Sequence, residues 1–119
     1  CRYVVDQDFI PRRSSVASVV IEGCEAGRPL SEATMWTVIG YPPAGHVVAA
    51  TASYVPDELR PTLPGHTSRA AIENESLRKK IFPIEAGSGQ RYIDMRALRE
   101  INRQQQKLSL QAYERKNKR

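Results

Sequence analysis

Residues 91–119 of this chain read RYIDMRALREINRQQQKLSLQAYERKNKR. Apolar side chains recur in this segment at spacings of three and four residues, the pattern of a helix that packs along one face. These residues are Leu98, Ile101, Leu108 and Ala112, and Gln105 takes the remaining position of the stripe. Successive residues of a helix are about 100° apart. The cations that fall on roughly the opposite face are therefore Arg96, Arg99, Arg103 and Lys107. The segment predicts one long amphipathic helix with a basic outer face.

The net positive charge of the chain lies entirely in this part. Residues 90–119 contain nine lysines and arginines and three acids, a net charge of +6, whereas the whole chain carries +5. Such asymmetry is typical of an arm that meets nucleic acid, an anionic membrane surface or an acidic protein, although a solvated helix face is the alternative. We expect the arm to dock on a partner. Its candidate contact residues are Arg96, Arg99, Arg103, Lys107, Arg115 and Lys116.

The composition predicts a small core. Of the 119 residues, 40% are hydrophobic and 7% aromatic, which is too few to cover a sheet and also surround a free-standing helix. We therefore expect the helix to be shared with another chain, or to lie across the sheet with its basic face outward. Six of the eight prolines fall in residues 42–83, and they predict extended connections of the kind that subunits use to thread along neighbours.

The rest of the chain predicts an α+β fold, a small antiparallel sheet of three or four strands followed by two helices. Strands are expected at residues 2–5, 15–21, 34–39 and 47–55, with Trp36 anchored in the core. A shorter helix at 69–82 begins after Thr67 or Ser68 and buries Ala70, Leu77 and Ile81. The domain boundaries expected are a β-rich body at 1–56, a proline-spaced linker at 57–67, the short helix at 68–83, a hinge at 84–89 containing Gly87-Ser88-Gly89, and the basic helix and tail at 90–119.

No pattern in the sequence predicts catalysis, a cofactor or a bound metal. His46 and His66 are the only histidines, and neither has a carboxylate or cysteine at the spacing of a metal site or a catalytic triad. Two cysteines are too few for a structural zinc site. No window approaches the ~18 consecutive apolar residues that a membrane-spanning helix needs. We expect a protein that is not an enzyme and has no transmembrane segment.

Cys1 and Cys24 leave several interpretations open. A chain that begins at Cys1 is compatible with removal of a methionine, with a fragment of a longer polypeptide, and with lipoprotein processing, in which Cys1 receives acyl chains. The two cysteines are also candidates for a disulfide in an oxidising compartment, although the sequence favours Cys24 as a small buried or turn residue. The sequence therefore does not determine the cellular compartment, and a lipid-anchored envelope protein is one candidate.

These features favour a non-catalytic structural or assembly subunit that docks on neighbouring subunits through its C-terminal helix and extended linkers. On this hypothesis, deleting residues 90–119 abolishes incorporation while the rest still folds. One alternative is a nucleic-acid-associated protein, such as a ribonucleoprotein component. Its contacts would be to phosphates, since Tyr92 and Tyr113 lie too far apart to form a stacking platform. A lipid-anchored cell-envelope component acylated at Cys1 is a further alternative.

Overall fold

The structure, a computed structural model, describes residues 2–85 and 91–117. Its strands and helices follow one another as β1 (Tyr3–Val5), β2 (Ala17–Glu22), β3 (Thr34–Ile39), β4 (Val48–Thr51), α1 (Arg69–Ile81), β5 (Ile84–Glu85), β6 (Arg91–Asp94) and α2 (Met95–Asn117). Short 3-10 turns lie between them, η1 (Asp6–Asp8), η2 (Leu30–Glu32), η3 (Pro42–Ala44) and η4 (Asp57–Leu59). The predicted α+β class and the long C-terminal helix are confirmed.

Residues 2–85 and 91–117 form two small antiparallel sheets. In the larger one the strand order is β2-β3-β4, and Trp36 lies opposite Val20 on one side and Ala49 on the other. In the smaller one the order is β1-β6-β5, and Ile93 of β6 lies opposite Val4 of β1. The larger sheet contains three of the four predicted strands. The fourth, predicted at residues 2–5, forms β1 and belongs to the smaller sheet, where it pairs with β6 about 90 residues further along the chain.

The helix prediction for residues 91–94 is wrong, because these residues form β6 and the helix begins at Met95. The physical reason is the pairing of β6 with β1, which buries Ile93 completely. Residues 84–85, expected to belong to a hinge, form β5 and pair with β6. The expected Gly87-Ser88-Gly89 break lies outside the described residues.

The core lies where the two helices and β6 meet, beside one end of the larger sheet. Its buried members are Tyr41, Ala44, Ile81, Phe82, Ile93 and Ile101, with Phe9, Leu77, Met95 and Leu98 packed around them. The rings of Tyr41 and Phe82 meet edge to face, with centroids 5.0 Å apart. The helix α1 begins as predicted, because the Ser68 hydroxyl accepts a hydrogen bond from the backbone N–H of Ala71 at 3.3 Å. Ala70 and Ile81 are buried, as predicted for this helix.

Two asparagines hold the loop between β3 and β4 against both helices. Asn74 of α1 is buried, donates to the Ile39 carbonyl and accepts from the backbone N–H of His46, both at 2.8 Å. Asn102 of α2 donates to the carbonyl of Pro43. Gly40 has φ +138°, and a Cβ there would lie 2.7 Å from the Cβ of Asn74. The loop therefore fixes α1 and α2 relative to the sheet.

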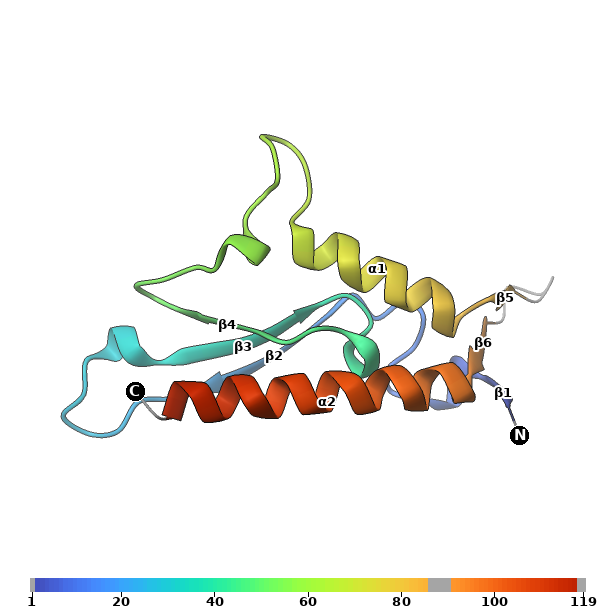
Figure 1. The fold of residues 1–119 in the computed structure, drawn as a ribbon, viewed down its shortest axis with the longest axis horizontal. Helices are drawn as coiled ribbons and strands as arrows, with labels where there is room; N and C mark the ends of the chain where they lie inside the picture. The colour runs from blue at the N-terminus through green and yellow to red at the C-terminus, as the bar shows by residue number, and fades with distance from the viewer. Residues whose placement is uncertain (1, 86–90, 118–119) are drawn as a thin grey trace.

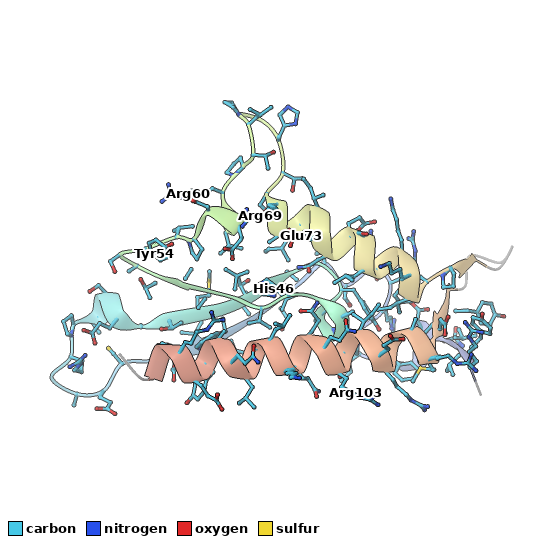
Figure 2. All side chains as sticks on the ribbon, in the orientation of Figure 1. His46, Tyr54, Arg60, Arg69, Glu73 and Arg103 are labelled. Carbon is cyan, nitrogen blue, oxygen red and sulfur yellow. The ribbon has the colours of Figure 1, made fainter. Side chains whose placement is uncertain are left out.

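The predicted proline-spaced linker is only partly extended. It begins with η4, which is tied to α1 by an ion pair between Glu58 and Arg69 at 3.4 Å, and both Arg69 and Glu73 project from the start of α1 (Figure 2). The backbone N–H of Thr62 then donates to the Thr67 carbonyl across a loop that projects from the body (Figure 1).

The larger sheet lies between the helices, with α1 on one side and α2 on the other (Figure 1). The molecule measures 54 × 34 × 20 Å and has a radius of gyration of 16.3 Å. A compact domain of this length has a radius of gyration of about 13.5 Å. The fold is thus flat and elongated, and much of its sheet lies outside the core. Trp36, expected in the core, is half-buried on the sheet and packs against Tyr113 of α2 at 5.8 Å between ring centroids.

Candidate interaction surface

The start of α2 is fixed by Asp94, the last residue of β6. One oxygen of its carboxylate accepts from the backbone N–H groups of Arg96 and Ala97, at 3.1 and 3.3 Å, and so caps the helix. The Arg2 guanidinium donates to both carboxylate oxygens, at 3.2 and 3.1 Å. The Arg2 hydrogen bond, followed by the backbone donors, holds the pKa of Asp94 below its usual value. The first strand and the long helix are thereby joined at one side chain.

Beyond this cap, α2 exposes a row of cations that we call the basic ridge: Arg96, Arg99, Arg103 and Lys107. With Arg2, the three arginines line an open cleft of about 570 Å³, and Glu100 is its one acidic lining residue among the described residues. No ion pair in the described part of the chain engages a ridge residue. Arg103 points away from the sheet (Figure 2). The structure therefore brings these four predicted contact residues together on the outer face of α2.

The two remaining predicted contact residues lie elsewhere. Arg115 is exposed, and its guanidinium donates to the carbonyl of Gln111 at 3.4 Å. Lys116 forms an ion pair with Glu22 of β2 and lies 5.5 Å from the centroid of the Trp36 ring. This ion pair, and then the Trp36 indole N–H, lowers the pKa of Glu22. Lys116 anchors the helix on its own body, so we leave it out of the ridge.

One residue of the predicted packing face of α2 is exposed in the structure. Leu98 and Ile101 pack against the core, and Ala112 is half-buried, but Leu108 is 44% exposed. The second half of α2 rests on the sheet through Tyr113, which is about 140° around the helix from Leu108. This contact sets the rotation of the helix and turns Leu108 toward solvent. Gln105 instead faces inward, and its side-chain oxygen is buried without a partner among the described residues.

A second exposed surface lies on β2, where sequence analysis named no candidate residue. Val19, Val20 and Ile21 are 49%, 63% and 73% exposed, although they alternate between the two faces of the strand. An open groove of about 530 Å³ runs between β2 and α2, lined by Val20, Ile21, Glu22, Trp36, Val47, Ser109 and Tyr113. The signal in the sequence was the unbroken Val-Val-Ile run, because a strand apolar on both faces is typical of one that is covered on both.

The histidines and Cys24 do not meet in the structure. His46 is half-buried in the loop held by Asn74, His66 is exposed in the projecting loop, and Cys24 is a free thiol 4.0 Å from the Arg28 carbonyl. Within residues 2–85 and 91–117, no group of three or more His, Cys, Asp or Glu side chains is placed to hold a metal ion. The predictions for Cys1, an acyl chain or a disulfide, lie outside the described residues.

In the described residues no helix combines the length and apolar character needed to cross a bilayer. Comparison of the chain with models of known families, with curated proteins and with solved structures finds no match.

Proposed function

We propose that this chain is a non-catalytic structural subunit of a larger assembly and that it docks on an acidic surface of a neighbouring subunit through the basic ridge. The observation that carries the proposal is the ridge itself, a row of cations without ion-pair partners in the described part of the chain. It stands on a helix that is anchored to the body at both ends. Asp94 caps its start, and Lys116 pairs with Glu22 near its end.

The spacing of the ridge supports a role in binding. Neighbouring ridge residues are three or four positions apart, and like charges at such spacing destabilise a helix by roughly 0.2–0.5 kcal/mol per pair. An acidic partner relieves this repulsion and gains charge-assisted contacts. Because α2 is already folded and held against the body, binding does not require the helix to be ordered first. The elongated shape also supports the proposal, since it leaves more surface for neighbours than a compact domain of this size.

Charge removal on the ridge tests the proposal in the intact assembly. We compare the double variant Arg99→Gln/Arg103→Gln with the matched control Lys79→Gln/Lys80→Gln, which removes the same charge from exposed positions on α1. Each tagged full-length chain is expressed in its own cells, and the lysate is separated by size under native conditions. We expect the ridge variant to move from the assembly to the free pool, while the control stays incorporated. Equal incorporation of the two variants would refute docking through the ridge.

A nucleic-acid partner is the second candidate, and the cleft lined by four arginines favours it. Four cations on the phosphates of a single strand predict a slope of about −3 for log K against log salt. The measurement is a titration of the purified chain with a mixed-sequence RNA oligonucleotide across salt concentrations. A steep slope that flattens in Arg99→Gln/Arg103→Gln, together with loss of the assembly on nuclease treatment, would favour this candidate over an acidic protein. A flat slope and a nuclease-resistant assembly favour the acidic protein.

A further inference from the structure

The free edge of β2 has a defined hydrogen-bonding pattern. The backbone N–H of Gly40 donates to the carbonyl of Val16 at 2.7 Å, and the antiparallel register continues from this pair along β3. Residues in hydrogen-bonded positions alternate along an antiparallel strand. Ser18, Val20 and Glu22 therefore direct their backbone groups toward β3. Ala17, Val19 and Ile21 direct theirs toward the opposite edge, where no strand in the described chain pairs with them.

The residues along this edge include none of the side chains that usually prevent strand association. Free edges are commonly protected by proline, lysine, a bulge or a covering loop. Residues 17–21 contain none of these residue types, and their side chains are exposed on both faces. The other edge of the same sheet, at β4, is followed by a turn in which Thr51 and Tyr54 exchange backbone hydrogen bonds at 2.9 and 3.2 Å.

We propose that β2 pairs antiparallel with β2 of a second copy of this chain, across a two-fold axis at Val19. In this register Val19 meets Val19 of the second copy, and Ala17 meets Ile21 in both directions. In this register all three residues whose backbone groups face the free edge pair with residues of the same set in the second copy. Sliding one strand by two residues would leave only two such pairs. The result is a continuous six-stranded sheet. The second copy is thus one neighbour of the chain in the proposed assembly. Only the role of the dimer within that assembly rests on the proposed function, and the pairing of the two strands does not.

Charge complementarity favours a second copy in the antiparallel direction. Arg12 and Arg13 precede β2 and Glu25 lies beyond its end, while Glu22 at the end is already paired with Lys116 of its own chain. Antiparallel pairing of two copies places the basic end of one strand beside the acidic end of the other. Parallel pairing in register would place like charges together, which is destabilising. At the end of the strand, Glu22 meets Val16, the residue before β2 in the second copy, so the proposed register brings no two charges of the same sign opposite each other.

The long helix adds apolar surface to the same interface. It runs in the same direction as β2 (Figure 1), with Tyr113 beside Val20 in the groove and Lys116 on Glu22. Leu110, which is 59% exposed, therefore lies near the level of Val19. The two-fold axis at Val19 places α2 of both copies on the same face of the joined sheet.

A charge-exchange experiment tests the register. The purified full-length chain is studied by sedimentation equilibrium, where a monomer has a mass of 13.4 kDa. We expect the wild type to approach twice this mass as its concentration rises. Val19→Lys and Val19→Glu, each alone, place like charges at the axis and should weaken dimerisation at least tenfold. An equimolar mixture of the two variants should recover a dimer, because lysine then faces glutamate.

Controls separate the interface from folding and from the ridge. Ile72→Lys, at an exposed position of α1, should leave dimerisation unchanged, and circular dichroism checks that each variant is folded. Arg99→Gln/Arg103→Gln should still dimerise, so failure of ridge docking and failure of dimerisation are distinguishable. A wild-type chain that stays monomeric at millimolar concentration would overturn the inference. So would a dimer that tolerates Val19→Lys, or a mixture of folded variants that stays monomeric.

Amide exchange provides an independent measurement of the same edge. In the monomer, the N–H groups of Ala17, Val19 and Ile21 face solvent, whereas those of Ser18 and Val20 are paired with β3. We expect protection of residues 17, 19 and 21 to rise with protein concentration, while residues 18 and 20 stay protected throughout. A dimer in which residues 17, 19 and 21 remain unprotected would place the interface elsewhere and refute the inference.

Discussion

Asn74 connects three segments through one buried side chain. It donates to the end of β3 and accepts from the loop before β4, while its own backbone belongs to α1. Leaving a buried donor or acceptor unpaired costs about 1–3 kcal/mol. The side chain also lies against Gly40, which leaves no room for a Cβ at that position. The position of the loop therefore depends on these two residues together.

Replacing Asn74 by alanine removes both hydrogen bonds and leaves the Ile39 carbonyl and the His46 N–H without partners. We expect the free energy of unfolding to fall by about 2–4 kcal/mol, the range for loss of a buried polar network and its packing. Urea titration followed by circular dichroism measures the change. Ser76→Ala, at an exposed position on the same helix, is the control and should change stability by less than about 0.5 kcal/mol. Equal stability of the two variants would contradict the structure.

The lowered pKa of Asp94 predicts that the free energy of unfolding depends on pH. Arg2 and the backbone donors lower its pKa in the folded state, so the unfolded chain binds the proton more tightly than the folded one. The stabilisation is therefore complete above the unfolded pKa, about 3.9, and is lost as the pH falls through the folded pKa. We expect Asp94→Asn to be less stable than the wild type at pH 7, with the difference shrinking below pH 4. Urea titrations at pH 7 and pH 3 measure this. An unchanged difference would show that the charge of Asp94 contributes nothing.

At the scale of elements, the second half of α2 rests on the sheet through two contacts around Trp36. Tyr113 packs against the indole ring, and Lys116 lies over it while pairing with Glu22. Trp36 is the only tryptophan, so its fluorescence reports directly on the docking of this part of the helix. The first half of α2 is held separately by the core, through Leu98 and Ile101.

We expect Tyr113→Ala to release the last turns of α2 while leaving the core intact. Loss of an aromatic pair costs about 0.5–1.5 kcal/mol beyond the lost burial. The Trp36 emission should shift to the red, and amide exchange in residues 109–116 should accelerate. Arg115→Ala, two residues away on an exposed position, should change neither measurement. A Trp36 spectrum that is unchanged in Tyr113→Ala would contradict the docked position of the helix.

At the scale of the whole molecule, the position of the core alters the effect expected from deleting the C-terminal segment. The sequence predicted that the rest of the chain folds without residues 90–119. In the structure, β6 and α2 supply Ile93 and Ile101 to the core, with Met95 and Leu98 packed beside them. The larger sheet alone lacks a buried cluster of this kind. We therefore replace that prediction, because removing these residues also removes the surface on which α1 and β1 pack.

Two truncations test the position of the core. A chain ending at residue 94 should lose cooperative thermal unfolding, since Ile101 and its neighbours are absent. A chain ending at residue 107 keeps them, so we expect it to unfold cooperatively at a lower temperature, with Trp36 more exposed. Differential scanning calorimetry compares both with the full chain. Cooperative unfolding of the shorter chain would show that the sheet has a sufficient core of its own.

Local patterns in the sequence determined the larger antiparallel sheet, the start of α1 at Ser68 and the outward position of the four ridge cations. Each depends on side-chain spacing or on a cap within a few residues, which the chain carries wherever it folds. The tertiary structure alone decided that residues 91–94 pair with β1, that Lys116 meets Glu22, and that Leu108 turns outward. The tertiary structure also decided that the outer edge of β2 has no neighbouring strand in the described residues. These outcomes depend on contacts between residues up to 94 positions apart, and local periodicity does not encode which distant segment becomes the neighbour.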